Sequence, residues 1–594
     1  MRKKILLIVL ILSCTMTFAN ERTESEMRSI AMQQIGKSAK HMQTKAMKNF
    51  NAGNYQLRKT YDNSALVAYA AEGIGTVFVS KNDYCRPVIG YTAALITDVN
   101  DMPCTFKWWL DEMERQLKSS EQKAVTKSGA TNMSLKEATS VSYHVVEPMV
   151  TTKWGQGDPF NSLCPESKGT TGLTGCTATQ IAQILNYWRY PQSASFESSY
   201  YIYETATSED MSEVPVTVSS TYTFPMLDAY GTYSVDGSKT NISNMYYDVN
   251  EAKNVATFMR DCAYSVQSQF YGSTEGTGAL SILTPYSLVY NFGYPAKSIK
   301  YLDRAFYTDK EWYAYIYGEL EKGSPIAYSG NDAQSGGHAF VVHGVDTDGL
   351  VAVNWGWNGV ADGYYAMDLM DSSNGTFNIY QRATIGIRTT PLPDDIASSS
   401  WVAPGWNVTL SEDISLTDRS TVQNIKIDLS NRIINLGLEP FIGNVALFIY
   451  DATDETFVAG YGLIEGTEAE PWEYYDYTSG TVTLKPEDYK SHLTNGHKYQ
   501  VMLISFTNEE DAKDEFNYVR TEGGIVFYSF DVDATGKLTM SDKVYEEQLP
   551  TSINNVKTEI NNLKENKRFN IMGQPVNDTF KGIVIENGLK KVVK

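Results

Sequence analysis

The sequence predicts an α+β protein of about three domains, followed by a small all-β tail. Its 594 residues are too many for one hydrophobic core. Apolar residues after Cys176 recur with helical spacing, which predicts a buried helix. Residues 397–545 instead carry short apolar and aromatic runs separated by turn residues, which predicts a β-sandwich. A composition of 42% hydrophobic and 20% charged residues is typical of globular chains.

The N-terminus, residues 1–19, is interpreted as a secretory signal peptide. Met1–Lys4 is a positively charged start, Ile5–Ser13 is an apolar run too short to span a bilayer, and Thr17–Ala19 offers a small-residue cleavage site. A lipoprotein cleavage site at Ser13-Cys14 is the alternative. No later segment is long and apolar enough to be transmembrane. We therefore expect an exported protein.

Charge and cysteine usage exclude two classes of partner. The net charge of −20, with no basic stripe along the chain, argues against binding to nucleic acid. The five cysteines after the signal peptide show no CxxC spacing, so neither a metal site nor a cofactor is expected. Their odd number leaves at least one thiol unpaired. We expect no disulfide between Cys164 and Cys176, and we interpret three others as buried thiols: Cys85, Cys104 and Cys262.

Residues 20–140 are expected to form a first α+β unit. A polar helix is predicted over Glu26–Asn51, strands over Ala65–Ser80, and a second helix over Phe106–Lys118. The polar stretch Ser119–Thr139 is interpreted as an exposed linker of the kind that proteases cut.

The rest of the chain divides into three parts. Residues 141–390 hold the chemical motifs and end at a Pro-rich boundary. Residues 397–545 form the predicted β-sandwich, in which Asn495-Gly496 and Gly523-Gly524 mark turns, and they contain no obvious catalytic constellation. Residues 550–594 are expected to form a few short strands with a basic end.

Cys176 is the candidate nucleophile. Apolar residues at helical spacing from Ala178 to Leu185 form one buried face, and Pro191 ends this helix. Cys176 therefore lies at the positive end of a helix, which favours the thiolate form. Gly175 before it permits close approach of a substrate backbone. An isolated cysteine is more often structural, so this interpretation depends on the neighbouring motifs.

His338 is the candidate partner of the thiol. His338 to Val345 alternates as a strand, so His338 and His343, which lie five residues apart, point to opposite faces. Only one of the two can meet Cys176. We favour His338 because it lies at the open, glycine-flanked end after Gly336 and Gly337, and we interpret His343 as structural.

The residue that supports the imidazole remains open between two neighbours. A turn centred between Thr347 and Asp348 pairs Phe340 with Trp355, which places Trp355 diagonal to His338 and within reach of it. Asn354, the more usual kind of orienting residue, points the other way in that register. It could turn in only if the strand were distorted. Trp355 is therefore ranked first and Asn354 is kept as the alternative.

Acyl transfer also needs hydrogen-bond donors for the developing oxyanion. Cys176 can offer its own backbone N–H. Gln156, which lies between two glycines upstream of Cys176, is the candidate side-chain donor.

Four pieces of the sequence together resemble the streptopain family of papain-like cysteine peptidases, in the same order along the chain. They are Trp154–Asn161, Thr174–Gln180, Gly336–Phe340 and Val353–Trp357. The likeness covers residues 141–390. Residues 22–130 resemble the inhibitory pro-segment of that family, most clearly at Gly75–Ser80 and Lys107–Leu110.

The resemblance implies a two-subdomain papain-like peptidase domain at 141–390 behind an α+β pro-domain at 20–140. It implies a secreted endopeptidase, of the virulence-associated kind, made as a zymogen that its own pro-domain inhibits. Protein or peptide substrates would be hydrolysed through a covalent acyl-enzyme. Cys176 would be the nucleophile and His338 the general base and acid. Further residues would line the oxyanion hole, support the imidazole or contact the substrate backbone: Gln156, Trp355, Asn354, Gly336, Gly337 and Thr277.

The tail carries a second resemblance. Phe569–Val576 and Gly582–Ile585 look like the C-terminal sorting segments of the Bacteroidetes type IX secretion system. This implies bacterial secretion machinery as a partner and a place outside the cell or on its surface. Two other functions stay open: a papain-like acyltransferase of the transglutaminase kind, and a catalytically silent adhesin that binds through its β-sandwich.

Overall fold

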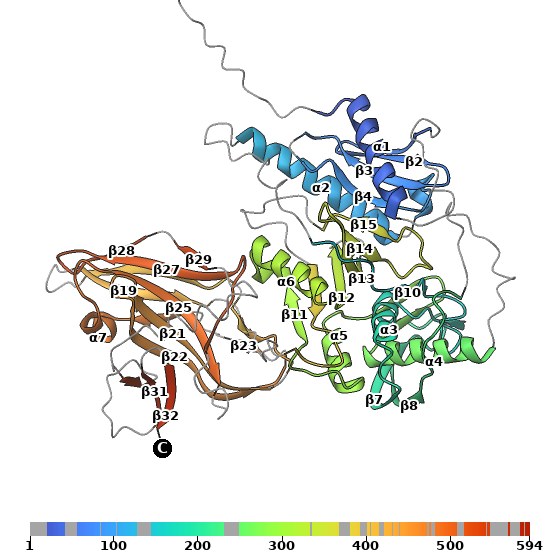
Figure 1. Ribbon diagram of the computed structural model, residues 1–594. Helices are drawn as coiled ribbons and strands as arrows, with labels where there is room; N and C mark the ends of the chain where they lie inside the picture. Colours follow the sequence, from blue (N-terminus) through green and yellow to red (C-terminus); the bar gives the residue numbers. More distant parts are fainter. Residues whose placement is uncertain are drawn as a thin grey trace, which may run out of the picture.

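The computed structural model describes most of the chain between residues 21 and 593, in the following ranges: 21–41, 56–83, 85–102, 104–126, 144–230, 249–332, 336–367, 381–392, 401–403, 405–414, 421–429, 432–438, 440–471, 474–476, 481–507, 516–541, 543–546, 568–570, 582–586 and 589–593. The signal peptide predicted at 1–19 lies outside these ranges. In Figure 1 the N-terminal segment, in blue, packs above the green and yellow central segment, and the orange C-terminal sheets lie beside it. None of the described helices has the length and apolarity needed to span a bilayer.

One ten-stranded sheet joins the N-terminal and central segments. Across the sheet the strands run in the order β1 (Arg58–Asp62), β2 (Leu66–Ala71), β3 (Gly75–Ser80), β4 (Val88–Thr92), β15 (Gly363–Tyr365), β14 (Val351–Asn354), β13 (Gly336–Val345), β12 (Ile326–Asp332), β16 (Gln381–Ile385) and β11 (Lys300–Asp303). The expected strands within Ala65–Ser80 are therefore β2 and β3. The sequence did not indicate that they continue the sheet of the motif-bearing segment.

The junction between the two segments is the antiparallel pair β4–β15. Thr92 pairs with Gly363, Tyr91 with Tyr364 and Gly90 with Tyr365. A Cβ at Gly363 would lie 2.3 Å from the Tyr91 carbonyl oxygen, and a Cβ at Gly90 would lie 2.6 Å from the Tyr365 ring. Because real Cβ atoms do not come this close to other atoms, glycine is needed on both strands for the junction to close.

Two helices complete the N-terminal segment. Helix α1 (Glu24–His41) and helix α2 (Cys104–Thr126) pack with its strands into one core, together with the short 3₁₀ turn Val99–Asp101. Helix α2 is longer than expected, because residues from Ser119 to Thr126 continue it into the stretch predicted as a linker. The residues Glu121, Gln122, Lys123 and Ala124 are good helix formers, which explains the extension. The rest of the predicted linker lies outside the described residues.

The central segment adds a second layer of helices and strands. Helix α3 (Cys176–Trp188) packs against helix α4 (Val249–Ser265) and strand β13. A four-stranded sheet has the order β10 (Gly276–Gly278), β9 (Gln269–Gly272), β7 (Ser193–Ile202) and β8 (Ser212–Thr221). Smaller elements are β5 (Glu166–Ser167), β6 (Thr170–Thr171), α5 (Leu283–Tyr286), the π-turn Ser287–Asn291, the 3₁₀ turn Arg304–Phe306 and α6 (Asp309–Glu321).

Strands β12 and β13 separate two hydrophobic cores. Tyr328, Phe340 and Val342 belong to the core shared with the N-terminal segment. Ala327 and Val341, which alternate with them, belong to the core built around α3, α4 and the four-stranded sheet. Because successive strand residues point to opposite faces, β13 is buried on both sides and its position is fixed from both.

The C-terminal segment is made almost entirely of strands. One sheet has the order β18 (Asn407–Ile414), β19 (Thr421–Asp428), β24 (Thr481–Leu484), and a seven-stranded sheet contains β22 (Thr456–Ala469), β21 (Phe441–Asp451), β25 (Lys498–Thr507), β27 (Ile525–Val532), β28 (Leu538–Met540), β26 (Phe516–Tyr518) and β29 (Val544–Glu546). These two sheets share one core, to which Ile425 and Leu447 belong. Smaller elements are β17 (Trp401–Val402), β20 (Arg432–Asn435), β23 (Tyr474–Asp476), α7 (Pro486–Tyr489) and the 3₁₀ turn Lys490–His492; a separate three-stranded sheet contains β30 (Arg568–Asn570), β31 (Gly582–Glu586) and β32 (Leu589–Val593).

A buried ion pair joins the C-terminal segment to the central one. The Arg520 guanidinium contacts both carboxylate oxygens of Glu311, at 2.8 and 3.2 Å, and also donates to the Phe306 carbonyl. It lies 4.1 Å from the centre of the Tyr307 ring. Glu311 is fully buried and also caps α6 through Thr308. A second contact is the Tyr290 hydroxyl, which donates to the Leu438 carbonyl at 2.7 Å.

We expect Arg520→Ala to destabilise the full-length chain by about 3–5 kcal/mol, because it leaves the buried Glu311 carboxylate without its cation. The measurement is the midpoint of urea unfolding. Arg115→Ala is the matched control, since Arg115 pairs with Glu112 on an exposed helix face and its loss should change stability by less than about 1 kcal/mol. Equal midpoints for the two variants would contradict a stabilising role for Arg520.

Candidate active site

Cys176 is the first residue of helix α3, as its sequence pattern predicts. Gly175, which caps the helix, has φ +85°, and a Cβ there would lie 3.1 Å from both the Cγ2 and the carbonyl oxygen of Thr277. Only glycine therefore fits this position without strain. The first N–H groups of a helix have no partner within it, so they and the helix dipole direct positive charge toward Cys176.

The surroundings of the Cys176 thiol shift its pKa in opposite directions. Burial raises the pKa of the thiol, while N–H groups near the sulfur, including that of Ala339, and the Thr177 hydroxyl lower it. Burial is the largest cause, so the thiol form is favoured in this arrangement. As a whole residue Cys176 is partly exposed, whereas Cys85, Cys164 and Cys262 are buried.

His338 is held by the backbone of Trp355. Its Nε2 lies 2.9 Å from the Trp355 carbonyl oxygen. Because a carbonyl can only accept, Nε2 must carry the proton, which leaves the Nδ1 lone pair as the basic site. The imidazole is buried and stacks on the Trp357 ring at 4.6 Å. Burial lowers the pKa of His338 to about 4, while the bond to Trp355 raises it, so the imidazole is neutral at neutral pH.

The thiol and the imidazole lie on adjacent elements, α3 and β13, yet within the described residues no hydrogen bond joins them. Ala339, whose N–H reaches the sulfur, is the residue next to His338. The structure thus brings the backbone beside His338 to Cys176, while the ring is anchored on Trp355. Among the described residues the expected thiol–imidazole hydrogen bond is therefore not formed in this arrangement, in which the N-terminal segment is in place.

At its end near His338, the β13–β14 hairpin has the predicted register. Val341 pairs with Asn354, which continues the expected pairing of Phe340 with Trp355, although a bulge lies between Val342 and Gly344. The rings of Phe340 and Trp355 are 4.9 Å apart, and that of Trp355 lies 6.2 Å from His338. Trp355 therefore meets His338 through its ring and its carbonyl.

Asn354 points away from His338, into a buried polar network. Its Oδ1 accepts from Gln183 Nε2 at 3.0 Å and from the Gly356 N–H at 2.9 Å, and its Nδ2 donates to the Thr152 carbonyl at 2.6 Å. The Thr152 hydroxyl in turn donates to Gln183 Oε1 at 2.9 Å. Asn354 thus connects α3, β14 and the loop at Thr152, and its hydrogen bonds do not involve the imidazole.

Gln180 links the Cys176 helix to the His338 strand. Its Nε2 donates to the carbonyls of Tyr328 and Phe340, a cross-strand pair of β12 and β13. Sequence reasoning missed both Gln180 and Gln183. The available signal was the presence of amide side chains in a helix that the apolar spacing predicts to be buried, because a buried amide needs hydrogen-bond partners from a neighbouring element.

Two of the other expected site residues contact the turn before Cys176, and two lie at the start of β13. The Gln156 carbonyl accepts from the Thr174 N–H at 3.1 Å, which ties the Gln156 loop to the turn before α3. The Thr277 hydroxyl donates to the Leu173 carbonyl at 2.7 Å on the other side of that turn. Gly337 is exposed, and Gly336 begins β13 beside it.

His343 takes no part in this arrangement. It is buried, its Nδ1 accepts from the Val150 N–H at 3.2 Å, and burial lowers its pKa to about 4. The structural interpretation made from its strand position agrees with this geometry.

Comparisons with known proteins concern the same part of the chain. Residues 154–365 match the Peptidase C10 family. The thiol protease/hemagglutinin PrtT of Porphyromonas gingivalis is 31% identical over 330 residues, which make up 53% of this chain and 36% of PrtT. The chain thus spans only about a third of the length of that relative. Streptopain of Streptococcus pyogenes is 26% identical over 388 residues, covering 62% of this chain and 92% of streptopain.

Two solved structures from Prevotella intermedia are also similar. A mutant fragment of prointerpain A is 30% identical and covers 57% of this chain and 100% of the fragment, with a TM-score of 0.46. The active wild-type interpain A cysteine protease is 34% identical and covers 41% of this chain and 95% of its own, with a TM-score of 0.35.

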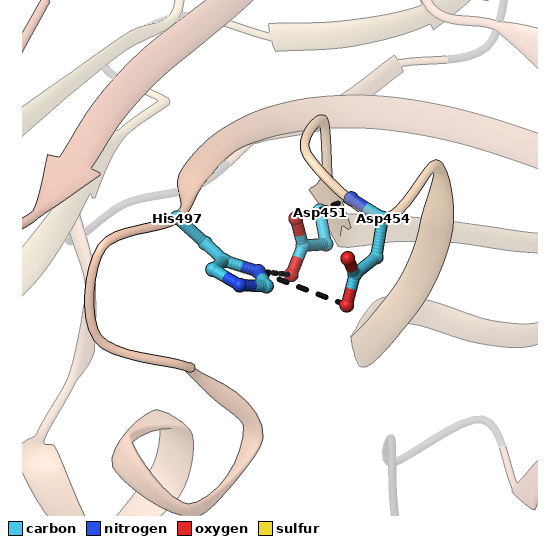
Figure 2. Close-up of side chains that lie close together, drawn as sticks. All are labelled: Asp451, Asp454 and His497. Atoms are coloured by element: carbon cyan, nitrogen blue, oxygen red, sulfur yellow. Dashed lines mark hydrogen bonds and ion pairs between the residues drawn. The ribbon is translucent and has the colours of Figure 1, made fainter.

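A second group of titratable side chains lies far from Cys176, on the C-terminal sheets. Figure 2 shows the His497 ring facing the carboxylates of Asp451 and Asp454. Nδ1 of His497 lies 2.8 Å from Asp451 and 3.8 Å from Asp454. Asp451 also accepts the N–H groups of Thr453 and Asp454. Such a group could ligate a cation, but its hydrogen bonds already account for it as an ion pair that closes the β21–β22 turn.

The ion pair predicts a pH optimum for the stability of the C-terminal sheets. Hydrogen bonding to Asp451 raises the pKa of His497, so its contribution is complete below its unfolded value of about 6.5 and is lost as pH rises through the raised value. The pKa of Asp451 is lowered, through hydrogen bonds that outweigh its burial, so its contribution is lost on acidification below about pH 4. Thermal unfolding between pH 5 and 9 should show the alkaline loss, and His497→Gln should remove it. A wild-type melting temperature that stays flat over this range would be evidence against the pair.

Proposed function

We propose, because this chain belongs to the Peptidase C10 family of cysteine-type peptidases, that it is a secreted endopeptidase made as a zymogen. Proteins or peptides would be its substrates. The observation that carries this proposal is the placement of a thiol at a helix N-terminus, against the strand that carries a histidine with a free Nδ1 lone pair.

In the proposed mechanism, Nδ1 of His338 takes the proton of the Cys176 thiol, and the thiolate attacks the carbonyl carbon of the scissile peptide. The imidazolium then donates this proton to the leaving amine, which gives an acyl-enzyme. Water, deprotonated by the same nitrogen, hydrolyses the thioester and restores the thiol. The ring must approach Cys176 for this chemistry, and the Trp355 carbonyl can keep Nε2 protonated throughout.

The oxyanion needs donors beside Cys176. The Cys176 N–H is at the free end of α3, and the Gln156 side chain is the second proposed donor. The hydrogen bond from Thr174 to the Gln156 carbonyl supports this role, since it holds the Gln156 loop next to the turn that carries the thiol. Loss of one such donor commonly costs about 10²–10³ in rate.

We propose that Trp355 supports the imidazole and that Asn354 has a structural part in holding α3 against β14. Their contacts favour this division, because Trp355 meets His338 whereas Asn354 bonds to Gln183 and Thr152. The substrate backbone would run along Gly336, Gly337 and Thr277, and the packing of Thr277 against Gly175 supports its part in this path.

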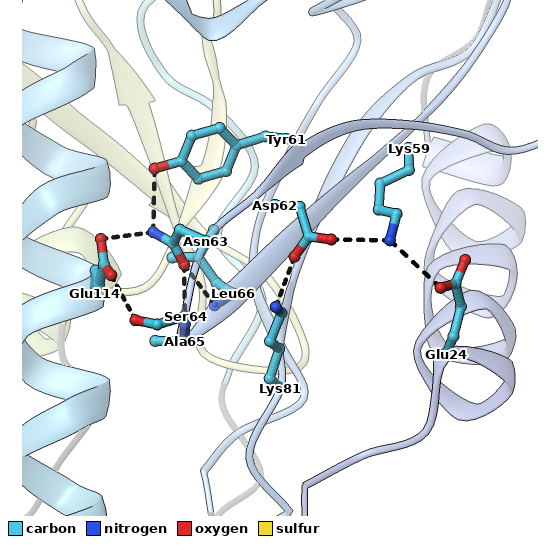
Figure 3. Close-up of polar contacts among 10 residues, drawn as sticks. All are labelled: Glu24, Lys59, Tyr61, Asp62, Asn63, Ser64, Ala65, Leu66, Lys81 and Glu114. Carbon is cyan, nitrogen blue, oxygen red and sulfur yellow. Dashed lines mark hydrogen bonds and ion pairs between the residues drawn. The ribbon is translucent and has the colours of Figure 1, made fainter.

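We propose that the N-terminal segment, residues 20–140, is an intramolecular inhibitor of the peptidase domain at 141–390. It pairs β4 with β15, and Phe106 on α2 lies 6.0 Å from the Trp355 ring that meets His338. Polar contacts link the elements within this segment, because Glu114 on α2 accepts from Asn63 and Ser64, and Lys59 bridges Asp62 and Glu24 (Figure 3). The prointerpain A fragment among the similar structures supports this assignment.

For the remaining parts we propose a signal peptide at 1–19, a β-sandwich domain at 397–545 and a C-terminal sorting segment at 550–594. The strands β30, β31 and β32 fall within the last of these. Export by bacterial secretion machinery would place the enzyme outside the cell or on its surface.

Cys176→Ala should abolish cleavage of casein by the full-length protein after its N-terminal segment has been removed by limited proteolysis. The sulfur supplies the only proposed nucleophile, so the loss should exceed about 10³-fold. The matched control is Cys164→Ala, which removes a buried thiol outside the site. Casein cleavage by the Cys176→Ala variant at the rate of this control would refute the mechanism.

Removal of the N-terminal segment should make Cys176 more reactive at slightly acid pH. In the arrangement described, burial raises the pKa of this thiol and His338 is neutral, so little thiolate is present at pH 6. Once the imidazole reaches the thiol, an ion pair should raise the rate of iodoacetamide alkylation at pH 6 by about tenfold or more. Mass spectrometry of the labelled peptide gives the rate. Cys164, whose pKa is raised by burial to about 12, serves as the internal control. Equal rates before and after trimming would rule out this form of inhibition.

A further inference from the structure

A carboxylate and the His338 imidazole bind the two ends of one residue. Asp362 Oδ1 accepts the Trp355 N–H at 2.9 Å, and the Trp355 carbonyl accepts the His338 Nε2–H, also at 2.9 Å. Asp362 does not bond to the imidazole itself. It bonds to the N–H of Trp355, the residue whose carbonyl accepts from the imidazole. The N–H and the carbonyl of Trp355 belong to adjacent peptide planes that share its Cα, so an anchor on the N–H restricts how far the carbonyl can turn only together with the anchors on the indole.

The Trp355 side chain is anchored from the same place. Its Nε1 donates to the Ala361 carbonyl at 3.1 Å, and the Tyr365 hydroxyl donates to that same oxygen. Ala361 and Asp362 together therefore hold both the indole and the main chain of Trp355. Trp355 is itself fully buried, so little else could compensate if this anchor were lost.

The charge of Asp362 depends on few neighbours. Burial raises its pKa to about 7, whereas the Trp355 N–H and the Lys153 ammonium lower it. The Tyr365 hydroxyl also interacts electrostatically with the carboxyl. His338 is linked to Asp362 only through the backbone of Trp355. Because most carboxyl groups ionise near pH 4, Asp362 is unusual in having both forms accessible near neutrality.

The N-terminal segment touches this anchor directly. The Thr92 hydroxyl donates to the Asp362 carbonyl at 2.7 Å, and Thr92 pairs with Gly363 in the β4–β15 junction. Departure of the N-terminal segment would remove these contacts and admit water to the Asp362 carboxyl. Water stabilises the ionised form, so the anchor would become more anionic when the enzyme is released.

We infer that Asp362 is a positioning residue for the proposed peptidase reaction. It acts through the backbone of Trp355 to hold His338 with Nε2 protonated and Nδ1 free, and its negative charge stabilises the imidazolium that forms opposite Cys176. This inference rests on the proposed function, in which His338 is the base. It distinguishes Asp362 from Asn354, whose contacts lead away from the imidazole.

The test compares Asp362→Asn with Asp346→Asn, both in the full-length chain with the N-terminal segment removed by limited proteolysis. Asp346 is the control because it is a buried carboxylate in the turn after β13 whose hydrogen bonds come from the N–H groups of Asp348 and Leu350 and from the Tyr91 hydroxyl, and not from Trp355. The readouts are kcat and KM on a peptide substrate, and the pH dependence of Cys176 alkylation by iodoacetamide.

We expect Asp362→Asn to lower kcat about tenfold or more, with KM within about twofold, because the loss concerns orientation of the base and not substrate binding. Loss of the negative charge should also lower the pH at which the imidazolium of the ion pair deprotonates by about one unit. Asp346→Asn should leave both readouts at the wild-type values. A wild-type kcat together with a wild-type alkylation profile for Asp362→Asn would overturn the inference.

Two further outcomes can be distinguished from a failure of the inference: an unstable variant and an inactive wild type. If the Asn variant melts below the assay temperature, Asp362→Glu decides, because its longer side chain displaces the acceptor from the Trp355 N–H; an unchanged kcat would then count against the inference. If the trimmed wild type cleaves neither casein nor the peptide, the proposed function fails. The alkylation profiles of the two Asn variants still show whether Asp362 acts on the His338–Cys176 pair.

Discussion

The amide of Gln180 joins the two halves of the site, and the remaining geometry depends on that bridge. One residue of the Cys176 helix donates to carbonyls on both β12 and β13, so the helix cannot shift along the strands without leaving buried carbonyls unpaired. An unpaired buried group of this kind costs about 1–3 kcal/mol. The Thr152–Gln183–Asn354 network repeats the arrangement one turn further along α3. Together they set the distance across which the thiol and the imidazole must act.

The imidazole is positioned by different means. Aromatic rings on one side and a carbonyl on the other hold it, and the aromatic layer continues from Trp357 through Trp355 to Phe106 of the N-terminal segment. The residues around His338 therefore belong to a core that the N-terminal segment completes. A segment whose removal changes the packing of this core can influence the base without touching the thiol.

Local patterns in the sequence predicted the elements that carry the site. The apolar spacing after Cys176 and the alternation after His338 are short-range signals. The expected pairing near His338 holds because a bulge between Val342 and Gly344 compensates for a turn centred on Asp348 and not between Thr347 and Asp348. Contacts between residues far apart in the sequence could not be predicted in this way. No local signal indicated that β4 would pair with β15, that Arg520 would reach Glu311, or that Asp362 would bind Trp355. Nor did any local signal indicate that the imidazole would bond to the Trp355 carbonyl without also bonding to the thiol.

The pairing of β4 with β15 has a consequence for the released enzyme. While the N-terminal segment is attached, β15 lies inside a continuous sheet. Once the segment leaves, the backbone N–H and C=O groups of β15 that paired with β4 become an exposed sheet edge. Such edges recruit extended chains, including those of neighbouring copies, and invite aggregation. The chain carries a net charge of −20, and mutual repulsion between copies opposes that association. The acidic composition that argues against nucleic-acid binding would therefore also oppose aggregation of the mature enzyme.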